Sequence, residues 1–266
     1  MDTFTSLITE ICAEEGIGCK ILSYGWLIEL SRSGQTRHII GRHFDVNPAA
    51  ADRIACDKYA CYTVLNSAGI PAFEHALFFN PLRRAHLIRG GEFERAESFL
   101  RQHKKIVVKP NAGWQGRDVF LCGTSKELEN ALCVIFQSEP DACLCPFYEY
   151  EYEYRVFYVD GICRFAYGKA RPPHEWRHNL SNGASAFEIT DEALRGRVEA
   201  LAARAARQIG IAFATVDIAR LNGDNDSLSV VEINSGITAN KFLEQKPGYW
   251  RQIKKIYSEA IGRMFL

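Results

Sequence analysis

The sequence predicts an α+β fold with a short α/β segment at its N-terminus. Two strand-like stretches, Tyr154–Val159 and Ile162–Tyr167, flank Asp160-Gly161, a dipeptide typical of two-residue β-hairpins. Residues 191–209 have their apolar side chains on one stripe, and Gly210 follows them, so we expect an amphipathic helix there. This mixture of hairpins and helices along the chain favours α+β over a purely parallel architecture.

The other elements follow from apolar periodicity and turn residues. We expect helices over residues 3–15, 54–68, 124–136 and 249–264, and Thr124 with Glu127 forms a capping box at the start of the third. We expect strands over residues 21–30, 37–40, 104–110, 118–122, 142–148, 213–221 and 228–234. The last two are joined by a polar turn, which predicts a second hairpin.

Composition excludes several classes of protein. The chain has 266 residues, 32 Lys and Arg against 32 Asp and Glu, and 47% hydrophobic residues, which is a globular balance and not that of a disordered or collagen-like chain. A net charge of zero argues against a dedicated nucleic-acid-binding protein. The basic and aromatic residues near the C-terminus are therefore interpreted as part of an amphipathic packing helix. No run of eighteen apolar residues is present, so we expect no membrane span.

Cysteine usage indicates a reducing compartment. The nine cysteines are irregularly spaced, and Cys143 with Cys145 is the one close pair, which is a weak zinc signal without a second pair or a nearby histidine. Residues 1–15 contain acids and no basic region, so no signal peptide is expected. We therefore expect buried thiols and a cytoplasmic location.

The second hairpin carries a candidate metal site. Glu232 and Asn234 are two residues apart, so their side chains share one face of a strand. Folding the hairpin about its polar turn places Asp217 opposite Glu232, and facing carboxylates are destabilising unless a cation lies between them. Oxygen ligands of this kind suit Mg²⁺, with open positions left for phosphate. The alternative is a solvated hairpin face with a one-residue bulge.

Two further segments contain candidate anion-binding groups. Lys109 ends a strand and precedes a loop with Gly113 and Gly116, whose backbone can turn N–H groups toward an anion, although an ordinary β-turn explains the glycines equally well. Three arginines and an asparagine follow further along the chain, and guanidinium groups bind oxyanions in bidentate fashion. They are Arg155, Arg171, Arg177 and Asn179. The alternative for each arginine taken singly is a solvent-facing position.

Taken together, six short motifs resemble the ATP-grasp superfamily. They are Asp57-Lys58, V-V-K-P-N-x-G-x-x-G-R at 107–117, E-Y-R-V at 153–156, N-x-x-x-G at 179–183, V-D-I at 216–218 and V-E-I-N-S at 231–235. Within the superfamily the chain is most similar to the amino-acid and peptide ligases: glutathione synthetase, cyanophycin synthetase and the ribosomal-protein glutamate ligases. D-alanine–D-alanine ligase is more distant. The resemblance covers about residues 54–240.

The resemblance implies two α+β subdomains that clasp ATP, preceded by the short N-terminal segment. The implied parts are residues 1–54, a central subdomain with a phosphate lid over 55–150, and a C-terminal subdomain with the metal site over 151–266. The implied ATP contacts are Lys58, Lys109, Gly113, Trp114, Gly116, Phe147, Glu149 and Glu153. The implied ligands of Mg²⁺ are Asp217, Glu232 and Asn234. Arg155, Arg177 and Asn179 would face the reacting phosphate, and Arg171, Ser235, Asn240 and Lys241 would shape the substrate pocket.

The implied activity is that of an ATP-dependent carboxylate–amine ligase that forms an amide through an acyl phosphate. The implied substrate is an amino acid or a peptide, free or borne on a carrier. An ATP-grasp kinase and a non-catalytic ATP-binding module are the alternatives. About fifty residues precede Asp57, fewer than such ligases usually carry, so a homo-oligomer or a partner would complete the site. No dedicated general base is evident. Glu188 and His178 are the candidates, but a surface position is favoured for both.

Overall fold

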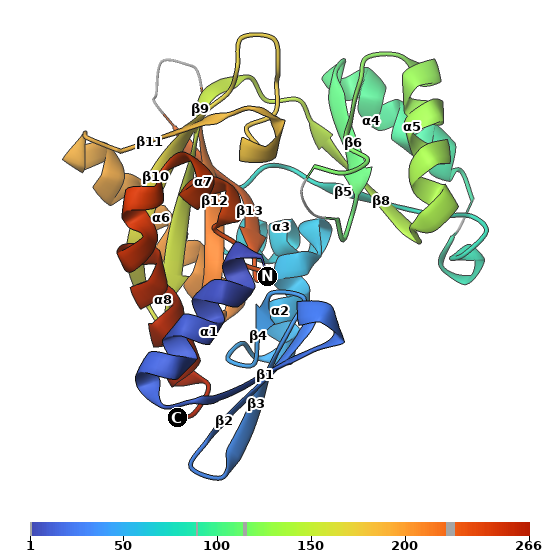
Figure 1. Cartoon of the computed structure of the whole chain (residues 1–266). Helices are drawn as coiled ribbons and strands as arrows, with labels where there is room; N and C mark the ends of the chain where they lie inside the picture. The colour runs from blue at the N-terminus through green and yellow to red at the C-terminus, as the bar shows by residue number, and fades with distance from the viewer. Residues whose placement is uncertain (1, 89, 114–115, 222–226) are drawn as a thin grey trace.

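A computed structural model describes residues 2–88, 90–113, 116–221 and 227–266, whose named strands form three antiparallel sheets (Figure 1). The N-terminal sheet has the order β1-β2-β3-β4, from Gly18–Leu22, Leu27–Arg32, Gln35–Ile40 and His43–Phe44. The central sheet has the order β5-β8-β6-β7, from Ala76–Phe79, Asp141–Pro146, Ile106–Pro110 and Phe120–Cys122. The large sheet has the order β11-β10-β9-β12-β13, from Ser185–Phe187, Ile162–Ala170, Tyr150–Val159, Phe213–Leu221 and Leu228–Asn234.

Helices cover these sheets. They are α1 (Thr3–Glu15), α2 (Ala49–Cys56), α3 (Lys58–Ser67), α4 (Glu92–His103), α5 (Ser125–Ser138), α6 (Glu192–Ile209), α7 (Asn240–Gln245) and α8 (Trp250–Arg263). Short 3-10 turns lie at Ser23–Gly25, Ala85–Leu87, Leu180–Asn182 and Pro247–Tyr249. Among the described helices, none has the length and apolar character needed to cross a membrane.

Most predicted elements are present at the expected positions. The capping box of Thr124 and Glu127 opens α5, and Asp160-Gly161 turns β9 into β10. Two predictions are wrong. The strand expected over 21–30 is a hairpin, β1 and β2, because residues 23–25 form a 3-10 turn in which Tyr24 has a positive φ. The helix expected over 54–68 is interrupted at Asp57, whose extended backbone ends α2 and whose carboxylate caps α3 through the N–H of Ala60.

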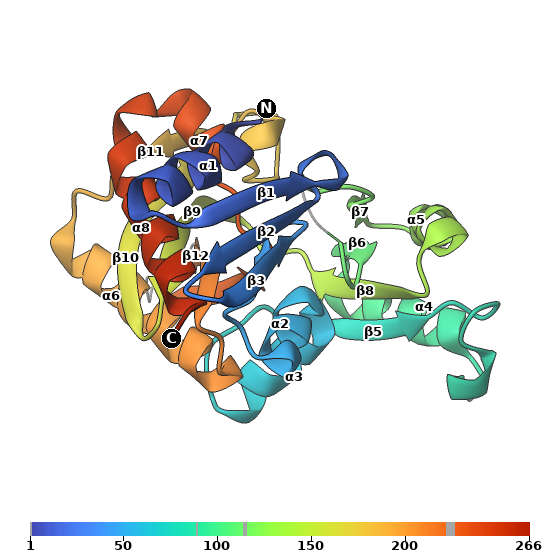
Figure 2. The same ribbon diagram turned by 60° about the horizontal axis from the view of Figure 1, so that its bottom comes forward.

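The large sheet is covered on both faces, and period-two alternation along β9 divides its residues between two cores. Phe157 and Val159 pack in a core that also contains residues of α1 and α8, whereas Val156 and Tyr158 pack in the core formed with α2, α3 and α6. Figure 2 shows α1 beside α8 behind the N-terminal sheet. The N-terminal segment therefore shares its core with the C-terminal helix, and the domain boundaries at 54 and 150 stay predictions.

The central sheet is covered by helices on one face. Ile106 and Val108 of β6 pack against α4 and α5, so the intervening Val107 and Lys109 point to the opposite face. On that face Val107 joins a small apolar group formed by Phe73, Cys145 and Ala219, which links the central sheet to the large one. The alternation of one strand thus directs Lys109 into the space between the two sheets.

A buried aromatic cluster joins the N-terminal segment to the large sheet. Phe44 lies edge-to-face against Phe213, with ring centroids 5.0 Å apart, and Phe4 lies edge-to-face against Tyr257 at 5.8 Å. The hydroxyl of Tyr257 is buried without a hydrogen-bond partner. Burial raises the pKa of Tyr257, so the hydroxyl stays protonated.

We expect Tyr257→Phe to raise the free energy of unfolding by about 1–3 kcal/mol, because a buried, unpaired hydroxyl costs roughly that much. Urea denaturation measures the change. Tyr158→Phe is the matched control, since the Tyr158 hydroxyl is paired with the backbone of Gly161 and its removal should lower the stability. A loss of stability in Tyr257→Phe would contradict the expectation.

Candidate functional site

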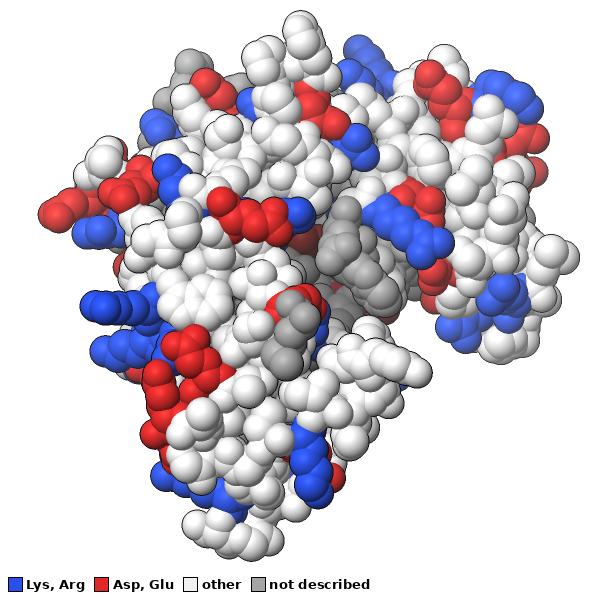
Figure 3. Space-filling view, in the orientation of Figure 1, with Lys and Arg blue, Asp and Glu red and all other residues white. Residues whose placement is uncertain are grey.

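A cleft of about 930 Å³, including space open to solvent, lies between the central and large sheets. Figure 3 shows the surface hollowed between these two parts, with basic and acidic side chains interspersed around it. Many predicted site residues line this cleft: Lys58, Lys109, Gly113, Gly116, Phe147, Glu153, Arg177, Asn179, Asp217 and Glu232.

The remaining predicted residues lie elsewhere. Trp114 is outside the described residues. Arg155 and Asn234 lie directly behind the cleft wall, where they contact Asp217 and Glu232 respectively. The others do not line the cleft among the described residues: Glu149, Arg171, Ser235, Asn240 and Lys241.

Lys58 holds the glycine-bearing loop in place. Its Nζ donates to the carbonyl oxygen of Gly113 at 2.8 Å and lies 3.5 Å from that of Asn111. Burial lowers the pKa of Lys58, against the opposing effect of the Glu232 carboxylate. The predicted contact of Lys58 with phosphate stays a prediction, and the structure adds a second role, because the same ammonium positions the loop.

The far end of the loop reaches the large sheet. Gly116 has a φ of +71°, and a Cβ at this position would lie 3.4 Å from the side-chain oxygen of Asn179. Asn179 precedes the 3-10 turn Leu180–Asn182, which leads into β11. The loop of the central sheet and the N-x-x-x-G segment therefore lie next to each other, with room at position 116 for a glycine but little for a larger residue.

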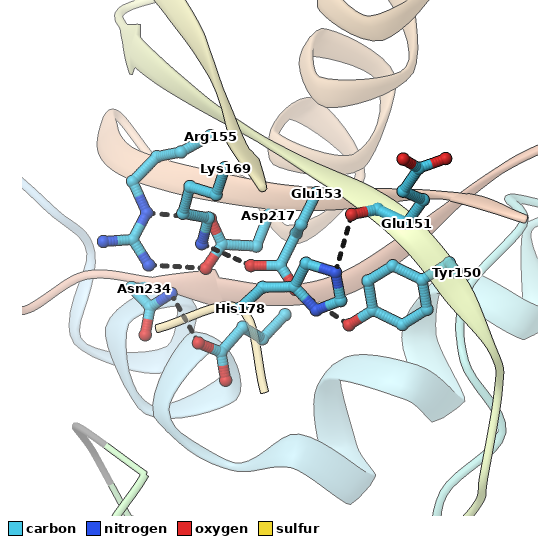
Figure 4. Close-up of polar contacts among 9 residues, drawn as sticks. Tyr150, Glu151, Glu153, Arg155, Lys169, His178, Asp217 and Asn234 are labelled. Atoms are coloured by element: carbon cyan, nitrogen blue, oxygen red, sulfur yellow. Dashed lines mark hydrogen bonds and ion pairs between the residues drawn. The ribbon is translucent and has the colours of Figure 1, made fainter. Parts of the chain in front are cut away.

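The predicted pairing of the two carboxylates is confirmed, because Asp217 and Glu232 are cross-strand partners in the hairpin of β12 and β13. Repulsion between the two carboxylates requires a cation nearby. Beside Asp217 this charge comes from side chains of the protein. Arg155 binds Asp217 in bidentate fashion, with Nε–Oδ1 at 2.8 Å and Nη2–Oδ2 at 2.5 Å. Lys169 Nζ lies 3.3 Å from Asp217 Oδ1 and forms a second ion pair with Glu153 (Figure 4).

These charges are almost fully removed from water. Asp217 is 1% exposed, Lys169 2% and Glu153 6%. Burial alone would raise the pKa of Asp217, but Arg155 and Lys169 outweigh it and hold this pKa below its usual range. Burial opposes the charge of Lys169 in the same way, and Asp217 with Glu153 raises its pKa nevertheless. Two cations and two anions thus form a charge-balanced network whose anions, Glu153 and Asp217, line the cleft.

Lys169 is a site residue that the sequence pattern does not indicate. The hairpin at Asp160-Gly161 was recognised, but a uniform register about that turn pairs Glu153 with Gly168. A bulge between Cys163 and Phe165 shifts the register by one residue, so that Lys169 lies opposite Glu153. A lysine on the strand next to Glu153 was the one indication of this ion pair in the sequence. The bulge that brings the two residues opposite each other cannot be predicted from the residue pattern.

Glu232 and Asn234 offer oxygen ligands at the cleft. Asn234 Nδ2 donates to Glu232 Oε1 at 3.1 Å, which leaves the asparagine carbonyl and the second carboxylate oxygen for another partner. These donors fit Mg²⁺. Asp217 fits less fully, because Oδ1 accepts from both Arg155 and Lys169, and Oδ2 keeps one lone pair beside its bond to Arg155.

The arginines of the segment after β10 are anchored within the protein. Arg177 binds Glu175 through Nη2–Oε2 at 2.7 Å, and this contact lowers the pKa of Glu175 to about 2. Arg171 donates to the carbonyl oxygens of Tyr150 and Glu175, both at 3.3 Å, so it clamps the segment to β9. Arg177 lines the cleft, whereas Arg171 lies outside it, bound to two backbone carbonyls and 4.0 Å from the Glu149 carboxylate.

An aromatic wall closes the apolar end of the cleft. Tyr148 stacks on Phe73 with centroids 4.2 Å apart, and Tyr150 stacks on His178 at the same distance. The N–H of Phe147 donates to the carbonyl oxygen of Lys105, so this group is already bonded within the protein. Expectation and structure differ at His178, which is 3% exposed and not a surface residue. Glu188 is exposed, as expected.

Comparison with known proteins decides the family. A sequence model described as a RimK-like ATP-grasp domain matches residues 55–248. The chain belongs to this family.

Solved structures share the ATP-grasp fold. D-alanine–D-alanine ligase from Bacillus anthracis superposes with a TM-score of 0.63 at 16% identity, covering 82% of this chain and 70% of that chain. A bifunctional glutathione synthetase from Pasteurella multocida gives a TM-score of 0.56 at 14% identity, covering 96% of this chain and 44% of that chain. A D-cycloserine synthetase gives 0.58 at 18% identity, covering 78% and 70%. No curated protein sequence matches significantly.

The buried network at the cleft of this ATP-grasp domain yields a stability prediction. Lys169→Met keeps the length of the side chain and removes its charge, which leaves Glu153 and Asp217 with one cation fewer. We expect a loss of about 3–5 kcal/mol in the free energy of unfolding, because a buried charge is left uncompensated. Denaturant unfolding measures it.

The matched control is Lys20→Met. Lys20 also pairs with a glutamate across two strands, with Nζ 2.8 Å from Glu29 Oε1, but its side chain is 73% exposed. We expect little change there, because solvent screens exposed ion pairs. Equal effects of the two substitutions would contradict the role assigned to burial.

Proposed function

We propose that this ATP-grasp domain is an ATP-dependent carboxylate–amine ligase, with an amino acid or a peptide as substrate. One observation carries the proposal. The cations Lys58 and Lys109 line the same cleft as the Glu232 carboxylate. Asn234, hydrogen-bonded to Glu232, offers a further oxygen ligand next to it. A triphosphate needs cations on one side and metal-binding oxygens on the other, and the family match supports ATP as its source.

The chemistry proposed is transfer of the ATP γ-phosphoryl group to a substrate carboxylate, followed by attack of an amine that displaces phosphate and leaves an amide. Bringing a carboxylate to a triphosphate is opposed by repulsion of about 4 kcal/mol for two unit charges 4 Å apart at an effective dielectric constant of about 20. Lys58, Lys109 and Arg177 line the cleft and are proposed to offset this repulsion. They also stabilise the charge that develops during transfer.

Glu232 and Asn234 would hold Mg²⁺, and Asp217 would add the free lone pair of Oδ2. Bound there, Mg²⁺ supplies charge neutralisation for the phosphate oxygens. The Arg155–Asp217 contact keeps the Asp217 carboxylate fixed in direction, so the strand pair β12–β13 presents its oxygens in one geometry. Asn179, which lies near Gly116 of the loop, is proposed to face the reacting phosphate when the loop covers it.

The aromatic wall is proposed to hold the adenine. Phe73, Tyr148 and Trp176 line the cleft and provide flat apolar surface, and Phe147 lies edge-to-face against Trp176. His178 Nδ1 is buried without a partner in the same wall. Burial lowers the pKa of His178, so the ring is neutral and this nitrogen is available to a ligand group.

The ribose contact and the substrate pocket are also part of the proposal. Glu153 is proposed as the ribose contact, although its carboxylate already receives the Tyr150 hydroxyl at 2.9 Å and pairs with Lys169. The residues proposed to shape the substrate pocket are Arg171, Ser235, Asn240 and Lys241. The proposed substrate is either free or borne on a carrier. The proposal also includes a second copy of the chain that completes the pocket.

The test is release of ADP and phosphate from ATP and Mg²⁺ in the presence of pooled amino acids and short peptides. We expect release that depends on the pool and falls by about 10²–10³ in Lys109→Ala and in Glu232→Gln, because each removes a group that stabilises transferred charge. Lys126→Ala and Glu129→Gln, an exposed ion pair on α5, are matched controls that should keep full activity.

Product mass separates the outcomes. An amide has lost water relative to its two substrates, which supports the ligase, whereas a phosphorylated substrate as the final product would indicate a kinase. Binding of ATP and Mg²⁺ by calorimetry without turnover on any pool would favour the binding module. Absence of ATP binding would overturn the proposal altogether.

A further inference from the structure

Outside the cleft, three potential metal ligands converge between the N-terminal segment and the large sheet. They are His43 of β4 and Asp52 and Cys56 of α2, and one ligand atom from each lies within 4.8 Å of the other two. None of the three lines the cleft. All are partly buried, with 33% of the His43 side chain and 25% of the Asp52 side chain exposed. A nitrogen, an oxygen and a sulfur donor are thus grouped at a place that solvent can reach.

Local geometry explains the convergence. Asp52 and Cys56 are four residues apart on α2, so they share one face of the helix. The His43 ring is packed against Gly236, where a Cβ would lie 2.9 Å from Nε2. This packing turns the other ring nitrogen, Nδ1, toward Asp52, whose Oδ1 is 3.2 Å away. The ring is therefore oriented by the backbone that follows β13.

Ser235 completes the group. Its hydroxyl oxygen lies 3.2 Å from His43 Nδ1 and 3.3 Å from Cys56 Sγ, and the residue is 1% exposed. A Ser–His–Asp relay requires the serine and the carboxylate on different ring nitrogens. Here both contact Nδ1, so the arrangement does not suit a nucleophile and its base. Four donors that face one point suit a coordinated cation.

We propose that His43 Nδ1, the Asp52 carboxylate and Cys56 Sγ bind a divalent transition-metal ion of the Zn²⁺ class, with Ser235 beside the fourth position. Zinc bonds of about 2.0 Å to nitrogen and oxygen place tetrahedral ligand atoms roughly 3.3 Å apart, close to the separation found between His43 and Asp52. A thiolate ligand selects against Mg²⁺. The charges of one thiolate and one carboxylate balance those of the ion.

A bound ion would connect β4, α2 and the backbone that follows Asn234. Ser235 is the next residue after this proposed Mg²⁺ ligand, so the site fixes the chain at the point where it leaves the cleft. An ion that binds the folded chain stabilises it by mass action. The site is distinct from the nucleotide cleft, and it exists whether or not the domain turns over ATP.

The experiment is titration of the full chain, freed of metal by a chelator, with Co²⁺ in an excess of Mg²⁺. We expect one Co²⁺ per chain, with sulfur-to-cobalt charge-transfer absorption, and competition by Zn²⁺. Cys56→Ser should abolish this absorption, and Asp52→Asn should weaken Co²⁺ binding at least tenfold. Cys133→Ser, which removes an exposed thiol on α5, is the matched control and should bind as the parent does.

Glu232→Gln should also bind Co²⁺ unchanged, which separates this site from the proposed Mg²⁺ ligands. Thermal unfolding gives a second readout, since Zn²⁺ should raise the Tm of the parent chain and leave that of folded Cys56→Ser unchanged. Absence of charge-transfer absorption in the parent chain, or equal absorption in Cys56→Ser, would overturn the proposal.

Discussion

The network of Arg155, Asp217, Lys169 and Glu153 constrains the rest of the site. Its members lie on three adjacent strands, β9, β10 and β12, and each is nearly or partly removed from water. Because side chains alternate between faces, a slip of one strand by one residue would move a charge into the apolar core formed with α6. Such a charge would have no counterion, so the ion pairs fix the register of the large sheet.

That register in turn places the groups at the cleft. Asp217 is held by two cations, and Glu232 lies opposite it on β13, the edge strand of the large sheet. The oxygens of Glu232 and Asn234 therefore rest on a rigid platform, whereas the facing cations belong to α3 and the central sheet. A buried network is weak evidence for stability as such, because removing charges from water is costly. Its clearer consequence here is a single strand register.

The parts of the site that depend on local residue spacing could be predicted from the sequence. The spacing of Glu232 and Asn234 and the polar turn before them were enough to pair Asp217 with Glu232, although nearer the turn a bulge shifts the register and Ile218 pairs with Val230. The same kind of bulge in the other hairpin concealed Lys169. Bulges depend on packing against the other layers, so a hairpin midpoint predicts a partner only to within one residue.

Contacts between residues far apart in the sequence could not be predicted from local residue patterns. The break at Asp57 was missed because the residues on both sides favour helix, and the cap is visible only once Ala60 donates to the Asp57 carboxylate. The site at His43 was missed for a similar reason, since its ligands come from β4 and α2 and its ring is oriented by Gly236. Helical spacing relates Asp52 to Cys56, but no sequence spacing relates them to Ser235 and Gly236, which lie far along the chain.

The connections between the two sheets form part of the cleft wall. One passes through Phe73, whose N–H donates to the carbonyl oxygen of Val230 in β13, and the other passes through Tyr148. Phe73 and Tyr148 stack on each other, and the N–H of Glu74 donates to the Tyr148 hydroxyl. The apolar group that joins the sheets here is small compared with the cores on either side. A ligand bound against this wall would therefore contact both connections at once, and the proposed adenine site rests on the two segments through which the central sheet is joined to the rest of the protein.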